Sequence, residues 1–168
     1  MVPPPTNTGP GWPPGKGAYA AGMGPLLVGI AIPLPVEEVW EEVSRLDRHA
    51  EWMADVDSIR FLSEARAGVG TRLAVGTRFG PLRTDDIMEV VEWEPPRCIG
   101  VEHRGLFTGR GRFLLEPAGP GATRFTWEEQ VRFPWFFGGP LGALAARPIF
   151  SLVWERNLRR LRRRLTAP

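Results

Sequence analysis

The chain has 168 residues and a formal net charge of +2, with 21 Lys and Arg against 19 Asp and Glu. This length favours one domain, which buries roughly two-thirds of its unfolded surface and needs neither disulfides nor a structural metal to fold. Cys98 is the single cysteine, and with the distant His49 and His103 it gives no zinc-binding spacing. We therefore expect no metal site and no cofactor.

The same features bear on location. A single thiol suits a reducing compartment, and the sequence shows neither a secretory signal nor an apolar run of about 20 residues, the length that spans a bilayer. We therefore expect a cytoplasmic protein. Proline and glycine are concentrated in residues 1–25, which predicts a disordered leader there and one folded domain over residues 26–168.

The domain opens with a strand and two short helices. LLVGIAI, residues 26–32, is rich in β-branched residues and stops at Pro33, which indicates a strand. Apolar residues then recur at helical spacing from Val36 to Val43, which predicts an amphipathic helix. Asp47 is placed to cap a second, shorter helix that runs through Trp52 and Met53.

The middle of the chain alternates with period two from about residue 59 to 133, which is typical of strands. Turn sequences rich in Gly and Pro delimit six strands near 57–63, 71–79, 82–93, 97–107, 109–116 and 122–132. Because the connections are too short for crossover helices, we expect an antiparallel meander.

A long helix is predicted at the C-terminus. Its apolar stripe consists of Phe150, Trp154, Leu158, Leu161 and Leu165. Pro148 either kinks this helix or marks its true start after a looser turn over 140–147.

The order of elements, together with several phrases, resembles a known superfamily. The phrases are VGIAIPLPVEEVWEEVSRLDRHAEWMADVDSI, GVGTR, EVVEWEPPRCIGVEHRG and GATRFTWEEQVRFP. They are similar to the START-like, helix-grip superfamily (SRPBCC), the polyketide cyclase/dehydrase and lipid transport type. The resemblance implies an α+β fold in which a curved antiparallel sheet of about seven strands wraps around the C-terminal helix. It also implies a cavity between the sheet and that helix.

Strand alternation selects the side chains that face this cavity. Arginines at 72 and 78 favour water, so Val75 and Phe79 point inward, and the same logic directs His103 and Glu129 inward. Asp86 points inward too, unless a β-bulge reverses it. Gly109 and Gly111 leave room for a ligand or, more readily, for the final helix.

The predicted ligand-binding residues combine these inward positions with residues at the expected portal and on the final helix. They are Trp52, Met53, Val75, Phe79, Met88, Val101, His103, Phe113, Trp127, Glu129, Phe150 and Trp154. Trp52 and Met53, with the aromatic segment 133–137, form either a portal or an apolar plug.

Three functions fit these residues. The first is binding or carriage of a small hydrophobic or aromatic molecule with a polar end. The second is an enzyme like the aromatic polyketide cyclases or dehydratases, with His103 as general acid or base and Glu129 orienting it. The alternative is that His103 and Glu129 bond to each other or to backbone groups, or lie at the open rim in water, and so only satisfy their own polar atoms. The third is a protein-interaction module, like the cochaperone members, that uses residues 133–137.

Partners other than a small ligand are expected to be few. Six arginines between 156 and 164 form a basic patch, but they spread around the helix and are expected to be a solvated face. We therefore expect no nucleic-acid partner, and a monomer or a homodimer.

Overall fold

The computed structural model describes residues 25–105, 107–132, 135 and 139–167. Residues 1–24 of the leader predicted over 1–25, and most of the aromatic segment 133–137, lie outside the described residues. The elements are β1 (Leu26–Ile32), α1 (Val36–Val43), the 3₁₀ helix η1 (Leu46–Glu51), β2 (Val56–Phe61), β3 (Arg72–Phe79), β4 (Leu82–Glu94), β5 (Cys98–Arg104), β6 (Thr108–Pro117), β7 (Thr123–Arg132) and α2 (Gly139–Thr166).

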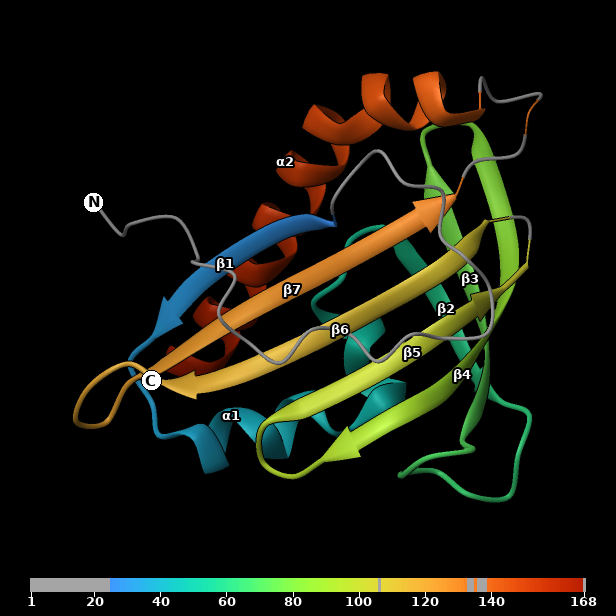
Figure 1. Ribbon diagram of the computed structural model, residues 1–168. Coiled ribbons are helices and arrows are strands. Elements are labelled where there is room, and N and C mark those ends of the chain that lie inside the picture. The colour runs from blue at the N-terminus through green and yellow to red at the C-terminus, as the bar shows by residue number, and fades with distance from the viewer. Residues whose placement is uncertain (1–24, 106, 133–134, 136–138, 168) are drawn as a thin grey trace.

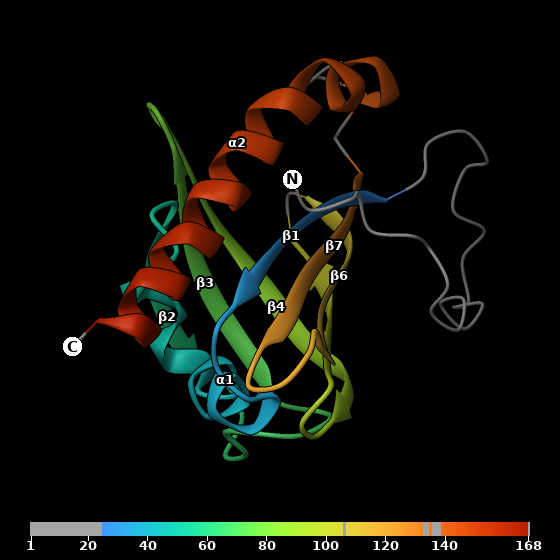
Figure 2. The same ribbon diagram turned by 90° about the vertical axis from the view of Figure 1, so that its left-hand side faces the viewer.

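The strands form one sheet of seven, in the order β1-β7-β6-β5-β4-β3-β2 (Figure 1). Every neighbouring pair is antiparallel. Strands β2 to β7 are therefore a meander, and β1 joins it beside β7. The sheet curls around α2, while α1 lies across one end of it (Figure 2). The predicted helix-grip α+β class is confirmed.

The second short helix differs from its prediction. It is a 3₁₀ helix that begins at Leu46, so Asp47 lies in its first turn and is not its cap. Leu46 is buried in the core and His49 donates its Nε2–H to the carbonyl of Val43 at 2.7 Å. These two tertiary contacts set the start of the helix in place of a side-chain cap.

Helix α2 runs through Pro148 without a break, so the expectation of a later start is wrong. A proline in a helix removes one backbone N–H and favours a bend. The helix changes direction along its N-terminal half (Figure 1).

The apolar core lies between the concave face of the sheet and α2. On the helix side it includes Trp154, Leu158 and Leu161 from the predicted stripe, with Phe150 and Leu165 packed against them. Full burial of such a side chain contributes about 1.5–3 kcal/mol. This stripe therefore holds α2 in the grip of the sheet and forms one wall of the space described next.

Candidate functional site

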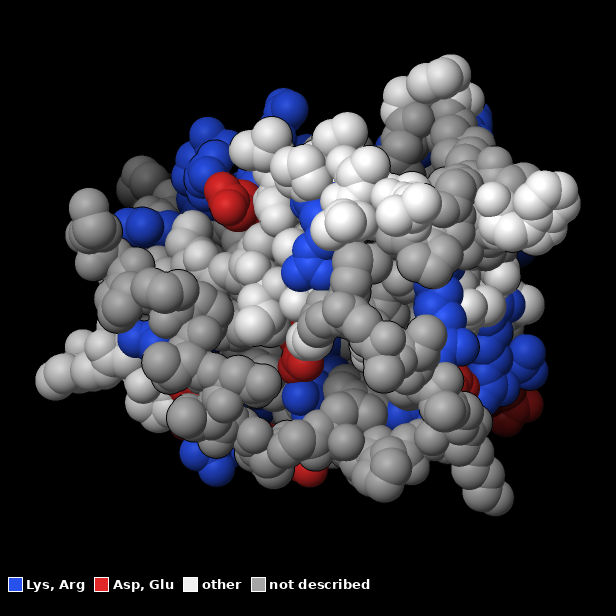
Figure 3. Space-filling model, turned by 45° about the horizontal axis from the view of Figure 1, so that its top comes forward, with Lys and Arg blue, Asp and Glu red and all other residues white. Residues whose placement is uncertain are grey.

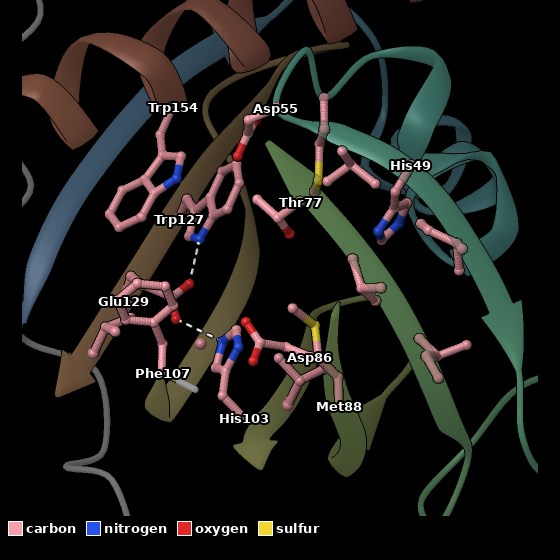
Figure 4. A pocket seen from close by; sticks show the side chains of 18 of the residues that line it. His49, Asp55, Thr77, Asp86, Met88, His103, Phe107, Trp127, Glu129 and Trp154 are labelled. Carbon is pink, nitrogen blue, oxygen red and sulfur yellow. Dashed lines mark hydrogen bonds and ion pairs between the residues drawn. The ribbon is translucent and has the colours of Figure 1, made fainter. Parts of the chain in front are cut away.

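A cavity of about 160 Å³ lies between the concave face of the sheet and α2. Ten of the twelve residues predicted for the site line it: Met53, Val75, Met88, Val101, His103, Phe113, Trp127, Glu129, Phe150 and Trp154. Most of this wall is aliphatic or aromatic, so the polar groups that face the cavity are few and placed at definite points (Figure 4).

The other two predicted residues have different places. Trp52 is fully buried in the core and does not line the cavity. Its ring packs against those of His49 and Phe113, with centroids 5.2 and 6.1 Å away. Trp52 therefore supports the wall from behind. The side chain of Phe79 lies outside the described part of the structure.

The register of the sheet brings His103 and Glu129 to the same face. His103 on β5 is paired with Met88 on β4 and with Gly109 on β6. Glu129 on β7 is paired with Gly111 on β6. Because side chains alternate between faces along a strand, Gly109 and Gly111 share one face of β6. On this face of the sheet the two polar side chains therefore lie on either side of β6, which carries only glycines there.

The imidazole and the carboxylate are in contact. His103 Nε2 lies 2.8 Å from Glu129 Oε1. No hydrogen bond of good geometry joins these two atoms, so Glu129 Oε1 can still accept one. Trp127 donates its Nε1–H to the other carboxylate oxygen, Oε2, at 2.8 Å. Glu129 is therefore fixed by an indole on its own strand and by a histidine two strands away (Figure 4).

The charges around His103 favour its protonated form. Burial by itself lowers the pKa of the imidazole, but the adjacent carboxylate of Glu129 and the nearby Asp86 outweigh it, and the pKa is raised. The inward direction expected of Asp86 agrees with its place in the cavity wall. The register shift in β4 falls later, between Val90 and Glu92, and does not reverse Asp86.

The glycines of this region make room for carboxylates. A Cβ on Gly111 would lie 2.5 Å from Glu129 Oε2, and a Cβ on Gly105 would overlap Oδ1 of Asp86. The Glu129 carboxylate thus takes up part of the room that Gly111 leaves, and Gly111 also lines the cavity.

Asp55 is a polar residue of the wall that sequence patterns missed. It precedes β2 in what the sequence indicates is a turn, yet it is buried, and burial raises the pKa of its carboxyl. Asn157 on α2 is fully buried, donates its Nδ2–H to Asp55 Oδ1 at 2.6 Å and accepts the N–H of Ala54 at 2.9 Å. A polar residue beside the apolar stripe of α2 was the signal for this contact.

His49 also lines the cavity and was not predicted there. Burial lowers the pKa of its imidazole to about 4, even though the bond to the Val43 carbonyl and the nearby acids oppose this. His49 is therefore a neutral hydrogen-bond donor near neutral pH. The two histidines of the chain face the same cavity, and their pKa values are shifted in opposite directions.

The basic helix end is partly neutralised by contacts. Arg164 pairs with Glu42 and Glu51, and Arg159 pairs with Glu155 at 2.7 Å. Figure 3 shows basic side chains at several separate places on this face, with uncharged residues between them. Trp135, the one described residue of segment 133–137, is 86% exposed. The interaction-module hypothesis falls mainly on residues outside the described part.

Two features typical of other functional classes are missing from the described residues. Within residues 25–105, 107–132, 135 and 139–167, no three His, Cys, Asp or Glu side chains are grouped as a metal site would require. Among the described helices, none has the length and hydropathy of a membrane span.

Comparison with known proteins gives the family. A family model described as polyketide cyclase/dehydrase and lipid transport matches residues 28–166. The chain belongs to this family. No curated protein matches it in sequence.

Solved structures similar to this polyketide cyclase/dehydrase and lipid transport family member share its fold. A protein from Thermus thermophilus is 22% identical, with a TM-score of 0.68 over 85% of this chain and 97% of its own. The ZhuI aromatase/cyclase from a Streptomyces species is 17% identical, with a TM-score of 0.63 over 85% and 96%. A START superfamily protein from Mycobacterium smegmatis is 18% identical, with a TM-score of 0.60 over 82% and 97%. The superfamily resemblance of the sequence is thereby confirmed.

Proposed function

We propose that the protein binds and carries a small hydrophobic or aromatic molecule with a polar end. The observation that carries this proposal is the cavity, an apolar space that meets a buried histidine–carboxylate pair at one point. Such pockets bind through apolar contact and orient the ligand through a few polar groups. The ligand's ring or chain lies against Val101, Trp127 and Trp154, and its polar end lies at Glu129.

The cellular setting of this carrier is proposed to be the cytoplasm. Cys98 is a free, buried cysteine. Burial and the nearby Glu92 raise the pKa of its thiol to about 12, so it remains an unreactive thiol in a reducing compartment. The carrier acts as a monomer or a homodimer.

Native mass spectrometry tests the binding proposal. The purified protein is mixed with lipids, isoprenoids and aromatic polyketides, and retained adducts are identified. Val101→Phe, which places a ring inside the cavity, should abolish retention. Ile87→Phe, a similar increase in size on the alternate face of β4, is the matched control and should retain the ligand. Equal retention by both variants would place the ligand outside the cavity.

A second candidate function is acid–base catalysis, favoured by the contact of His103 with Glu129 and by its raised pKa. As an imidazolium, His103 is suited to be a general acid. In a dehydration it would give its proton to a departing hydroxyl, which leaves as water. The neutral imidazole would then take a proton from the adjacent carbon, which restores the imidazolium. Glu129 stabilises the charged form at both ends of this cycle.

Turnover is tested on any polyketide that the binding experiment retains. Mass spectrometry should detect loss of one water from a retained β-hydroxy compound. His103→Gln should abolish that loss and keep binding. Binding without any chemical change in the wild-type protein would leave carriage as the function and exclude this reaction for the compound tested.

A further inference from the structure

The wall of the cavity carries more acidic than basic side chains directed into it. Three carboxylates line it, those of Asp55, Asp86 and Glu129, and each of these residues is less than a tenth exposed. They come from three separate places in the chain, the segment before β2, β4 and β7. Burial raises the pKa of the Asp55 carboxyl. Asp86 and Glu129 are the two acidic groups that act on His103.

Positive charge facing the same space is limited. His49 is held neutral, as an N–H donor to the Val43 carbonyl. Arg112 also borders the cavity, but its position on β6 alternates with that of Gly111. Its guanidinium pairs with Glu128 at 2.7 Å and with Glu92 at 3.8 Å on the other face of the sheet. Among the described lining residues, His103 is thus the basic side chain that is directed into the cavity and whose pKa is raised.

The imidazole of His103 already has acidic partners. Its Nε2 lies 2.8 Å from Glu129 Oε1, and Asp86 also stabilises its cationic form. A ligand carboxylate placed beside His103 would approach two buried carboxylates at the same time. In a space lined mainly by apolar groups, where water screens poorly, that repulsion opposes binding.

The hydrogen-bonding capacity of the pocket favours donors. Glu129 Oε1 has no hydrogen bond of good geometry, although it touches His103, and as a carboxylate oxygen it only accepts. The Thr84 hydroxyl is buried in the same wall and, in the described part of the structure, has no hydrogen-bond partner. A hydroxyl on a ligand can donate to Glu129 Oε1, whereas Thr84, on β4 and three strands from β7, is a separate hydroxyl of the wall.

The size of the cavity sets the size of the ligand. Its volume of about 160 Å³ is close to that of apolar protein cavities of about 150 Å³ that accept benzene. Phe113, Trp127 and Phe150 supply aromatic faces and edges along this wall. A single substituted ring matches the space.

Resting on the proposed binding function, we infer that the cavity selects ligands by charge: it takes a phenol-like ring, whose hydroxyl donates to Glu129, and rejects ring carboxylates and free fatty acids. Asp86 contributes to the rejection by keeping the net charge of the cluster negative. The selectivity therefore depends on side chains from three strands, Asp86 on β4, His103 on β5 and Glu129 on β7, which contact the polar end of the ligand.

Three probes of matched shape test this inference: toluene, p-cresol and p-toluate. Their affinities for the wild-type protein are measured near neutral pH by NMR titration. We expect p-cresol to bind at least tenfold more tightly than p-toluate, with toluene between them. Binding of p-toluate as tight as that of p-cresol would overturn the inference and leave the proposed binding function intact. Binding of none of the three would instead contradict ring binding in this cavity.

Two variants then test whether Glu129 and Asp86 cause the selectivity. Glu129→Gln and Asp86→Asn remove one negative charge each with little change of shape, and each should narrow the gap between p-cresol and p-toluate by at least threefold. Glu89→Gln, a change of the same kind on the opposite face of β4 whose partner Arg104 does not line the cavity, should leave the gap unchanged. If a cavity variant fails to fold, the wild-type probe series alone decides. An equal effect of all three variants would contradict a local charge mechanism.

Discussion

Gly111 lies directly against the carboxylate of Glu129, so that a Cβ at position 111 would come within 2.5 Å of Oε2 and 3.0 Å of Cδ. The two residues are register partners across β6 and β7. A Cβ at position 111 would push the carboxylate away from its contacts with Trp127 and His103. The glycine is thus part of the machinery that orients Glu129.

Gly111→Ala is therefore expected to destabilise the protein by about 1–3 kcal/mol, as overpacking of a core does, and to weaken binding of p-cresol. Urea unfolding and NMR titration measure the two effects. In a Glu129→Ala background, where the carboxylate is gone, the same substitution should cost little. Additive effects of the two substitutions would show that the glycine and the carboxylate do not interact.

Asn157→Ala is expected to loosen α2 from the rest of the fold. The substitution takes the Asn157 amide away from the buried Asp55 carboxylate and from the Ala54 N–H. Each buried polar group left unsatisfied costs about 1–3 kcal/mol. We expect a loss of at least that size in urea unfolding. Arg159→Ala, which breaks an exposed pair with Glu155 on the same helix, should change stability by less than about 1 kcal/mol.

The pKa of His103 gives a prediction for the alkaline side. Because its pKa is raised above the ordinary 6.5, its contribution to stability is fully present below pH 6.5 and is lost as the pH rises through the higher folded value. Glu129→Gln removes the main attraction, so burial should then lower the pKa of His103. NMR titration of the imidazole measures this shift. An unchanged pKa in Glu129→Gln would contradict the assigned cause.

The pKa of His49 predicts the opposite behaviour on the acid side. Its folded value is about 4 and its ordinary value 6.5, so the unfolded chain binds a proton first and stability falls as the pH drops through this window. Each pKa unit corresponds to about 1.4 kcal/mol. His49→Gln, which retains an N–H for the Val43 carbonyl, should flatten this acid limb in urea unfolding. If the stability of His49→Gln fell as steeply with decreasing pH as that of the wild-type protein, the acid sensitivity would come from carboxylates instead.

Strand alternation predicted the inward residues because side chains point to opposite faces in turn, so a sheet with one apolar face has apolar residues at every second position. It placed His103, Glu129 and Asp86 on the concave side, and the register agrees. What it missed depends on contacts across the chain. Asp55 is buried because Asn157, 102 positions later, bonds to it, and no local pattern encodes that pairing.

The helices also divide into features that local spacing predicts and features that depend on further contacts. The apolar stripe of α2 was readable from its spacing, whereas the start of η1 depends on burial of Leu46 and on the bond of His49 to Val43. Trp52 shows the limit for aromatic residues, since the sequence indicated either a portal or an apolar plug, and the structure buries Trp52 behind the wall. Composition alone does not distinguish an aromatic residue of the wall from one of the core.

Trp154 joins the core to the cavity wall. Its ring is stacked on that of Trp127, with centroids 5.2 Å apart, and on that of Phe150, 5.4 Å away. It is 7% exposed, belongs to the core cluster and also lines the cavity. Trp154→Phe keeps an aromatic face against Trp127 and enlarges the cavity. We expect the fold to persist.

The affinity for p-cresol should then change at least tenfold, which corresponds to about 1.4 kcal/mol. Leu161→Ala is the control, since Leu161 is fully buried in the same helix and does not line the cavity. It should cost about 2–5 kcal/mol of stability and leave the affinity of the folded protein unchanged. The melting temperature and an NMR titration of each variant separate the two cases. Unchanged affinity in Trp154→Phe with a large fall in melting temperature would make Trp154 ordinary core, with the ligand bound elsewhere.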